Sequence, residues 1–552
     1  MTAYERLARL AESGHFEETL ARCADLVEAM ESTRTGGLTH DALEDVIEGR
    51  LRTIGHGAIA DHLALRALRE QPVSPRPVGA DEIPRTRLEH GHDTVLTSLF
   101  GDVTVVRKAY RAPGVRNLYP ADRDLNLPDG QYSHGLRRRI VRAVAISPYD
   151  EAIDAVERDT GVRVGKRQAV QAVERAAMDL EAFYALPPDE RLPPDDRDAT
   201  ATTIMGEEDR ALGEGADQQQ ADGDAPERGL LVLQADGKGI PMRPDGLRAQ
   251  AAKAAAEAKA TDRRRTGLAS AEKTGRTRMA EVTTVYRIAR APRTIDDVVP
   301  APGRRDTAEA AAARAAKRRA APRPVDRWLS ASLVDDIPTA IATMFDQAEL
   351  RDHGRELDWV ALVDGNNAQI AAIEAEATRR DLTLTVIVDV IHVIGYLWKA
   401  AAVFFTCDDP DDPGGKNWLR DRLRALLAGR ARDVATGIRR RATGEALTGT
   451  GRQTIDEVAR YLDAKAPYLD YPTALAEGYP IATGVMEGAC RHLVMDRFEV
   501  GGARWGLEGA EAVLGLRAVI TNGDFDAYWR FHLRQELRRN HDSKYAEPHT
   551  PT

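Results

Sequence analysis

The sequence lacks three features: abundant cysteine, long apolar runs and an excess of positive charge. Its 3 cysteines are spaced too widely for a CxxC metal or redox pair, so a disulfide framework is not expected. The most apolar window, 384–405, contains an aspartate, a histidine and a lysine, which a membrane-spanning helix would rarely tolerate. No signal-peptide pattern begins the chain. We therefore expect a soluble, cytoplasmic protein.

The net charge of −10 argues at first against a nucleic-acid partner, but the charge is unevenly distributed. Residues 207–227 are acidic and rich in Gly and Gln, without an apolar period, which predicts a disordered linker. Phosphate backbones attract basic clusters, although one Ala-rich basic stretch can equally be a solvated helix. Four such tracts together favour a nucleic acid as the partner. These tracts lie at 137–139, 236–293, 304–323 and 420–441.

The length of 552 residues predicts three or four domains at about 150 residues each. We expect a multi-domain α+β and α/β protein. The predicted parts are a helical module at 1–90, a region with a β-hairpin and a helix-turn-helix at 91–185, an acidic linker at 186–228, a core of strands and helices at 229–410 with a basic insertion at 245–275, an all-α insertion at 411–480 and a C-terminal segment at 481–540.

Two β-rich runs, 94–100 and 103–110, are separated by Gly101-Asp102. A two-residue connection that contains glycine suits a type II′ turn, so these runs predict a β-hairpin.

A helix-turn-helix pattern follows the hairpin. An apolar-periodic helix near 150–158 is followed by a break at Thr160-Gly161 and a second helix that begins near Lys166. In such a pair, the first residues of the second helix enter the major groove. The alternative is an ordinary pair of helices with a charged face. The residues predicted to contact DNA are Arg163, Lys166, Arg167 and Gln168.

Three acidic residues carry the prediction of an active site. Asp236 and Asp364 each end an apolar run that reads as a buried strand, whereas Glu487 lies in a helical segment. Alternating strands and helices predict parallel strands whose carboxyl ends meet at one edge. Two carboxylates at that edge plus one on a helix can hold two Mg²⁺ or Mn²⁺ ions, which clamp both oxygens of an in-line phosphoryl displacement. Nucleotidyl transferases that act on DNA use this plan.

The chain resembles the DDE-class insertion-sequence transposases of bacteria, in particular the ISKra-type group allied to Mutator-like elements. The segments that carry the resemblance are TSLFGDVTVVRKAYRA, YSHGLRRR, GVRVGKRQ, LQADGKGI, RMAEVTTVYRI, WVALVDGN and, most specifically, YPIATGVMEGACRHLVMDRFEVGGARW. The resemblance implies an RNase H-like catalytic domain in which Asp236, Asp364 and Glu487 are the catalytic, metal-binding acids. It also implies cleavage and strand transfer on double-stranded DNA, both at the terminal inverted repeats and at the target. The resemblance further implies a homodimer or higher assembly in the bacterial cytoplasm or nucleoid.

Asp389 competes with Asp364 for the place of the second acid, because Asp389 and His392 fit the D(2)H pattern of Mutator-like transposases. If Asp364 is the second acid, both residues lie near the metals or contact DNA, and His392 could equally be a core histidine. Arg491 follows Glu487 by one helical turn, where it would orient the carboxylate, contact the scissile phosphate or form an intrahelical ion pair.

Further DNA contacts are expected from the basic insertion and its edge, at Lys273, Arg276 and Arg278. Two other classes of function fit the same residues. One is an RNase H-like structure-selective nuclease or resolvase that performs no strand transfer, and the other is a catalytically inert, transposon-derived DNA-binding protein.

Overall fold

The computed structural model describes residues 9, 12–191, 229–249, 251–253, 276–300, 312, 316, 321–405 and 413–546. The chain divides into two compact units that mix helices and sheets. Unit 1 comprises residues 1–185 and 524–552, and unit 2 comprises residues 186–523. Among the described residues, no helix has both the length and the apolar character that crossing a membrane requires.

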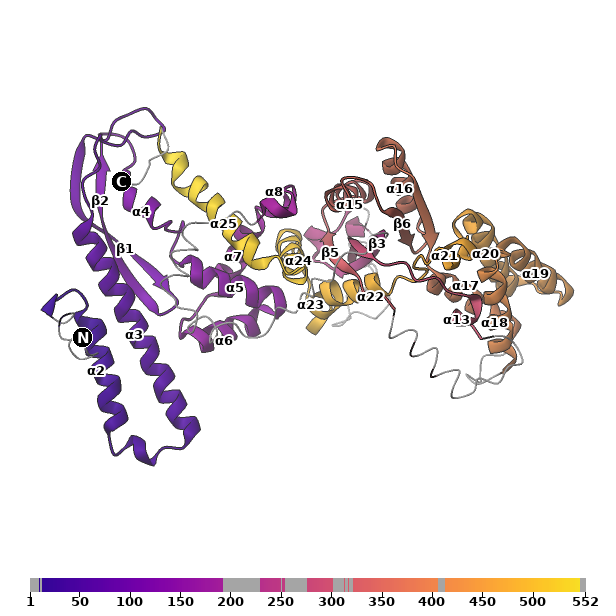
Figure 1. Ribbon diagram of the computed structural model, residues 1–552, viewed down its shortest axis with the longest axis horizontal. Helices are drawn as coiled ribbons and strands as arrows, with labels where there is room; N and C mark the ends of the chain where they lie inside the picture. Colours follow the sequence, from indigo (N-terminus) through magenta and orange to yellow (C-terminus); the bar gives the residue numbers. More distant parts are fainter. Residues whose placement is uncertain are drawn as a thin grey trace. The chain divides into compact units, whose positions relative to one another are not determined.

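Unit 1 begins with two predicted helices that lie side by side (Figure 1). They are α2 (Glu17–Glu31) and α3 (His40–Arg69), and the Thr39 side chain caps the start of α3 by accepting from a backbone N–H. Helix α3 packs on the hairpin strand β2 through Leu63, Val103 and Val105.

The predicted hairpin is present as β1 (Arg87–Ser98) and β2 (Gly101–Arg111). The position predicted for its turn is wrong, because Ser98 pairs with Gly101 and the connection is therefore Leu99-Phe100. Gly101 has φ of 106°, a value that L side chains rarely adopt, and it serves as the first residue of β2 instead of the turn.

The two helices of the predicted helix-turn-helix pair are confirmed as α6 (Tyr149–Thr160) and α7 (Lys166–Ala177). Gly161 ends α6 in the left-handed conformation that commonly stops helices. The remaining helices of unit 1 are α4 (Pro120–Asp124), α5 (His134–Ile146), α8 (Leu180–Tyr184) and α25 (Phe525–Asn540). The sequence groups 525–540 with the Glu487 segment, whereas α25 belongs to unit 1.

Unit 2 is built on a five-stranded sheet with the order β5-β4-β3-β6-β7. Its strands are β3 (Leu230–Pro241), β4 (Thr277–Ile288), β5 (Val325–Ser332), β6 (Asp358–Val363) and β7 (Leu384–Val388). The expectation of parallel strands holds for β3, β6 and β7 and is wrong for β4 and β5, which run antiparallel to their neighbours.

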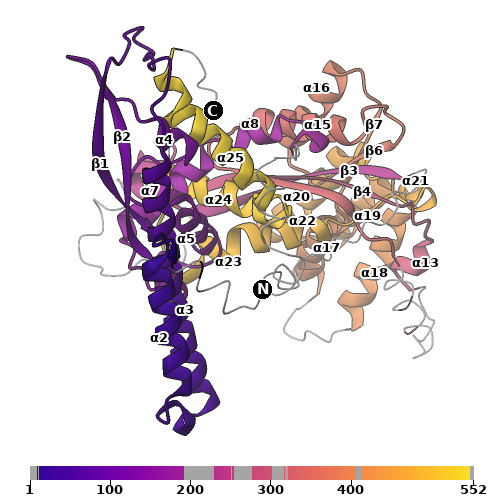
Figure 2. The same cartoon turned by 60° about the vertical axis from the view of Figure 1, so that its left-hand side comes forward.

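Helices cover both faces of this sheet. On one side lie α15 (Ile337–Arg351) and α16 (Asn367–Arg379), and on the other lie α17 (Val390–Phe404) and α22 (Gly484–Cys490) (Figure 1, Figure 2). Residues 230–235 of β3 and 359–363 of β6 are accordingly buried throughout, as strands covered on both faces must be.

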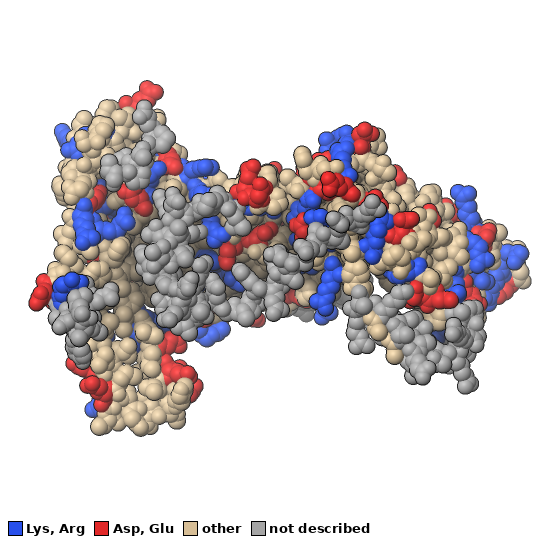
Figure 3. Space-filling model, viewed as in Figure 1, with Lys and Arg blue, Asp and Glu red and all other residues tan. Residues whose placement is uncertain are grey.

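The segment between β7 and Glu487, which the sequence predicts to be all-α, is helical in the described residues. It contains α18 (Pro413–Leu427), α19 (Ala431–Gly444), α20 (Gly449–Lys465) and α21 (Tyr471–Ala476). Lys and Arg side chains gather where these helices lie (Figure 3). The other helices of unit 2 are α13 (Ile295–Val298), the π-helix Arg491–Met495, α23 (Asp496–Phe498) and α24 (Leu507–Thr521).

Some predicted features lie outside the described residues. They are the linker from 192 to 228, most of the basic insertion 245–275 including Lys273, and most of the basic tract 304–323.

Candidate functional site

The register of β3 and β6 brings the first two predicted acids together. The last parallel pair is Ala235 with Val363, and Asp236 and Asp364 are the next residues on their strands. The sequence predicts that the first strand ends at Asp236, and this prediction is wrong. Strand β3 continues to Pro241, because its later residues pair with β4 in antiparallel register. What ends at Asp236 is the pairing with β6, so the two acids still share one edge.

The two carboxylates lie close enough to repel each other. Burial raises the pKa of Asp236 above its ordinary value, and the charge of Asp364 raises it further. The Gly237 N–H donates to Asp236 Oδ1 at 2.7 Å and the Cys490 thiol donates to Oδ2 at 3.5 Å. Among the described residues, neither acid forms an ion pair with a Lys or Arg side chain. No direct ion pair therefore balances the charge of these two carboxylates, although Lys465 lies within electrostatic reach of Asp364. A divalent cation would relieve the repulsion between them.

Glu487 does not form a metal-binding group with Asp236 and Asp364 in this structure. Its helix α22 packs on β3, but the Glu487 side chain is exposed and the residue that reaches Asp236 is Cys490, three positions later on the same helix. In the part of the chain that the structure describes, no three His, Cys, Asp or Glu residues are grouped so that they could hold a metal ion. The Asp236–Asp364 pair fits a divalent cation, and Glu487 as third ligand stays a prediction.

Asp389 serves a structural purpose. It follows β7, caps α17 by accepting from the Ile391 N–H at 2.8 Å, and accepts a hydrogen bond from the Thr483 hydroxyl. The side chain is buried, and each of its oxygens has a donor. The pKa of Asp236 responds to Asp364, which favours Asp364 over Asp389 as the second acid.

His392 is exposed, so the core-histidine alternative does not hold. Its positive form lowers the pKa of Asp236, which places the imidazole near that carboxylate. Arg491 is also exposed, and its guanidinium lies 3.9 Å from Asp496. That contact favours a local ion pair with Asp496.

Sequence reasoning missed Glu281 and the contact made by Cys490. Glu281 on β4 pairs with Gly237, accepts a hydrogen bond from Gln369 at 3.3 Å and is half-buried. Burial raises the pKa of Glu281, and the charges of Asp236 and Asp364 raise it further. Burial and Asp236 likewise raise the pKa of the Cys490 thiol, which stays protonated. A third carboxylate thus lies within electrostatic reach of the pair.

The four residues predicted to read DNA are all exposed in unit 1. Lys166, the first residue of α7, forms an ion pair with Asp150 of α6 at 2.8 Å. Because both side chains are more than half exposed, this pair would cost little to break when a phosphate approaches.

Arg278 is already engaged in unit 2, where it donates to the backbone carbonyls of Leu333 and Gly246. Its predicted contact with DNA would require giving up these bonds. Arg276 is half-buried.

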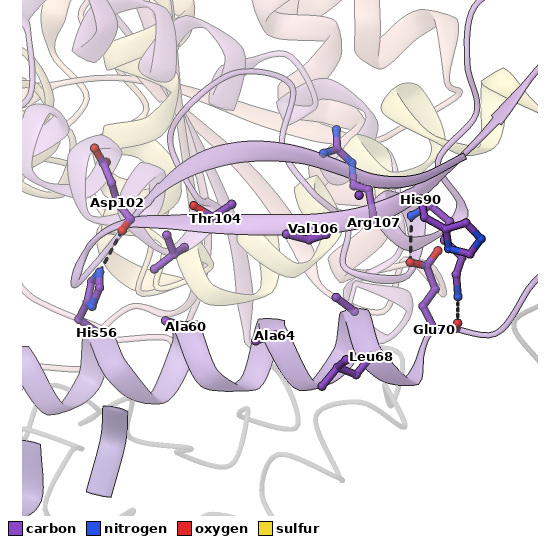
Figure 4. Close-up of a pocket in the computed structure, with 14 residues that line it drawn as sticks. His56, Ala60, Ala64, Leu68, Glu70, His90, Asp102, Thr104, Val106 and Arg107 are labelled. Atoms are coloured by element: carbon purple, nitrogen blue, oxygen red, sulfur yellow. Dashed lines mark hydrogen bonds between the residues drawn. The ribbon is translucent and has the colours of Figure 1, made fainter. Parts of the chain in front are cut away.

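A cavity of about 660 Å³ lies between α3 and β2 in unit 1 (Figure 4). Its walls include Ala60, Ala64 and Val106, with His56 hydrogen-bonded to the Asp102 carbonyl at one end. None of the predicted site residues lines it.

No protein-family model and no curated protein matches this chain.

The raised pKa of Asp236 leads to a testable pH dependence. In the metal-free protein, Asp236 should take up its proton above the ordinary aspartate value of about 3.9 as the pH falls. Asp364→Asn removes the repelling charge and should lower that pKa, whereas His392→Ala removes an attracting charge and should raise it. Carbon-13 NMR titration of aspartate-labelled protein measures both shifts. If the wild-type pKa of Asp236 is ordinary and Asp364→Asn leaves it unchanged, the two carboxylates do not lie close together.

Proposed function

We propose that this protein is a transposase that binds the terminal inverted repeats of an insertion sequence and performs metal-dependent DNA cleavage and strand transfer. The observation that carries the proposal is the pairing of Asp236 and Asp364 at the edge where β3 and β6 part, where burial and then the charge of Asp364 raise the pKa of Asp236. The resemblance of the sequence to DDE-class transposases supplies the reaction.

An RNase H-like core is part of this proposal. In such a core the second acid follows the fourth strand, and β6, which precedes Asp364, is the fourth strand of the sheet in chain order. The all-α segment α18–α21 between the second acid and Glu487 agrees with an insertion at that place. The mixed sheet covered by helices on both faces is compatible with this assignment.

In the proposed mechanism Asp236 and Asp364 would hold the metal ions, and Glu487 would supply the third carboxylate. When bound, two Mg²⁺ or Mn²⁺ ions would neutralise the attacked phosphate and stabilise the leaving oxygen. The fixed backbone of β3 and β6 positions both carboxylates before the substrate arrives, which avoids reorganisation during the reaction. The exposed imidazole of His392 lies near Asp236, where it can contact the DNA strand that enters the site.

End recognition is assigned to α6 and α7, as a helix-turn-helix. Replacing both Lys166 and Arg167 by Ala in the full chain should weaken binding to a fragment that carries the flanks of the gene, by about 1–3 kcal/mol for each base-reading side chain removed. The salt dependence should also become shallower, because fewer counterions are released. Gel-shift titration at several salt concentrations measures both effects. Arg66→Ala, an exposed charge on α3, is the control and should bind as the wild type does. Unchanged binding by the double variant would remove the helix-turn-helix from the proposal.

Strand transfer distinguishes the transposase from a structure-selective nuclease with the same acids. The assay mixes wild-type protein and Mg²⁺ with a donor fragment that carries both flanks of the gene and with a target plasmid. A transposase should join the donor to the plasmid, whereas an enzyme that only hydrolyses DNA would give no joined product. Because two ends must be brought together, a homodimer or higher assembly is proposed as the active form.

A further inference from the structure

Two tyrosine rings stack beside the acidic pair. Tyr396 on α17 and Tyr461 on α20 lie nearly parallel, with ring centroids 3.7 Å apart and an interplanar angle of 8°. The Tyr461 hydroxyl donates to the carbonyl oxygen of Asp364 at 3.4 Å. Burial raises the pKa of Tyr461, and Tyr396 and the charges of Asp364 and Asp389 raise it further, so the ring stays a neutral phenol. The stacked rings therefore adjoin the candidate metal site.

One face of α17 links this stack to Asp236. His392, Tyr396 and Lys399 are spaced by four and three positions, which puts them on the same side of the helix. We call these three residues the α17 stripe. The imidazole of His392 lies near Asp236, the centroids of the His392 and Tyr396 rings are 6.5 Å apart, and Lys399 Nζ lies 4.4 Å from the Tyr396 centroid.

The stripe is open to solvent, since His392 and Lys399 are exposed and Tyr396 is half-buried. Tyr461 covers one face of the Tyr396 ring at a separation that leaves no room between the rings, so Lys399 lies over the opposite face. The group over that face is a flexible ammonium. A planar ligand could displace the ammonium and stack on Tyr396, with Tyr461 as a second layer beneath.

The neighbouring groups indicate which planar ligand fits. A base of a nucleic acid offers a flat π-face to the ring, and the phosphate next to the base offers a partner to the displaced ammonium. A small apolar ring could stack on Tyr396, but it would offer no counter-charge to the displaced Lys399 ammonium. A base within an intact duplex has no free face, so the ligand must be unpaired.

We propose that the α17 stripe and Tyr461 bind an unpaired DNA base next to the phosphate that is cut. The base stacks on Tyr396, Lys399 contacts the adjoining phosphate, and His392 lies between this base and the acids. This inference rests on the proposed function and adds to it that DNA strands must separate locally at the cleavage point.

The binding test uses a single-stranded oligonucleotide of mixed sequence with one 2-aminopurine, in EDTA, so that it does not depend on cleavage. Wild-type protein should quench the fluorescence of the base by stacking, and an intact duplex of the same sequence should bind without this quenching. Tyr396→Ala should bind the oligonucleotide about 5- to 100-fold more weakly, and Tyr396→Phe, which keeps the ring, should bind as the wild type does. Lys399→Ala, at an exposed position, should reduce the slope of affinity against salt by about one phosphate contact.

Trp398→Ala is the matched control. This exposed aromatic residue is two positions from Tyr396 and therefore points away from the stripe, so its loss should leave quenching and affinity unchanged. Two results would overturn the inference. One is an equal loss of quenching and affinity in Trp398→Ala and Tyr396→Ala. The other is normal quenching in Tyr396→Ala together with a normal salt slope in Lys399→Ala.

Cleavage assays separate this inference from the proposed function. Tyr396→Ala should cut a fully paired flank fragment more slowly than the wild type and should regain rate when the bases at the cut are mismatched. If the wild type cuts no DNA in Mg²⁺, the proposed function fails whatever the stacking result is. If the wild type cuts and Tyr396→Ala cuts both fragments equally well, the inference fails and the proposed function stands.

Discussion

Asp236→Asn should abolish DNA cleavage while the protein still folds and binds DNA. Asparagine keeps the size of the side chain and removes the charge that offsets a divalent cation, and hard cations prefer charged oxygens. Loss of one group that stabilises the transition state typically lowers the rate by about 10²–10³-fold, and a metal ligand should cost at least as much. Asp364→Asn and Glu487→Gln should show the same loss. The measurement is cleavage of an end-labelled fragment carrying a flank of the gene, in Mg²⁺ or Mn²⁺, with EDTA as the stop.

Asp389→Asn is the informative comparison in that assay. Because the Asp389 carboxylate caps α17 and accepts a hydrogen bond from Thr483, replacing it by a side-chain amide should lower the stability of the fold. Cleavage should remain measurable. Activity in Asp236→Asn or Glu487→Gln that equals the wild type would mean that these acids are structural. Loss of cleavage in Asp389→Asn with full activity in Asp364→Asn would transfer the role of second acid to Asp389.

Glu536→Ala should strongly destabilise unit 1. The Glu536 side chain is fully buried on α25, accepts from Arg175 Nε at 2.8 Å and from Asn540 Nδ2 at 3.1 Å, and lies 3.7 Å from Arg137. Removing one partner of a buried ionic group leaves uncompensated charge, at a cost of about 3–5 kcal/mol. Urea unfolding followed by hydrogen exchange in α7 and α25 measures the loss in unit 1 separately from unit 2.

The control on the same helix is Asp526→Ala. Asp526 pairs with Arg138 at 2.6 Å, but both side chains are about half exposed, so the loss should stay below about 1 kcal/mol.

Burial raises the pKa of Glu536, but the Arg175 hydrogen bond and nearby positive charges outweigh it and leave the pKa below its ordinary value. The Glu536 contribution is therefore present above about pH 4.3 and is lost as the pH falls through the lower folded-state pKa. Equal effects of the two substitutions at neutral pH would contradict this account of the buried cluster.

The sequence predicts the elements with strong periodicity. Helices α6 and α7 appear within a few residues of their predicted bounds, because the apolar spacing within each helix and the Thr160-Gly161 break between them are local signals. The sequence also predicts that Asp236 and Asp364 share an edge, since each follows a run of buried residues.

What the sequence could not predict depends on pairing between distant segments. Strand β3 extends past Asp236 only because β4 pairs with it, and β5 is a strand only because its Leu329 and Trp328 fit against β4. The nearness of Glu281 to the acids and the stacking of Tyr396 on Tyr461 follow from the same kind of long-range contact. Nothing local in 525–540 indicates that α25 completes unit 1.

Binding of Mn²⁺ to the purified, DNA-free protein shows whether Asp236 and Asp364 form a metal site. Electron paramagnetic resonance counts free Mn²⁺ as the ion is titrated into wild type, Asp236→Asn, Asp364→Asn and the double variant. We expect the wild type to bind Mn²⁺, each single variant to bind it far more weakly, and the double variant not to bind it at this site. Identical titration curves for the wild type and the double variant would contradict the claim that Asp236 and Asp364 form a metal site.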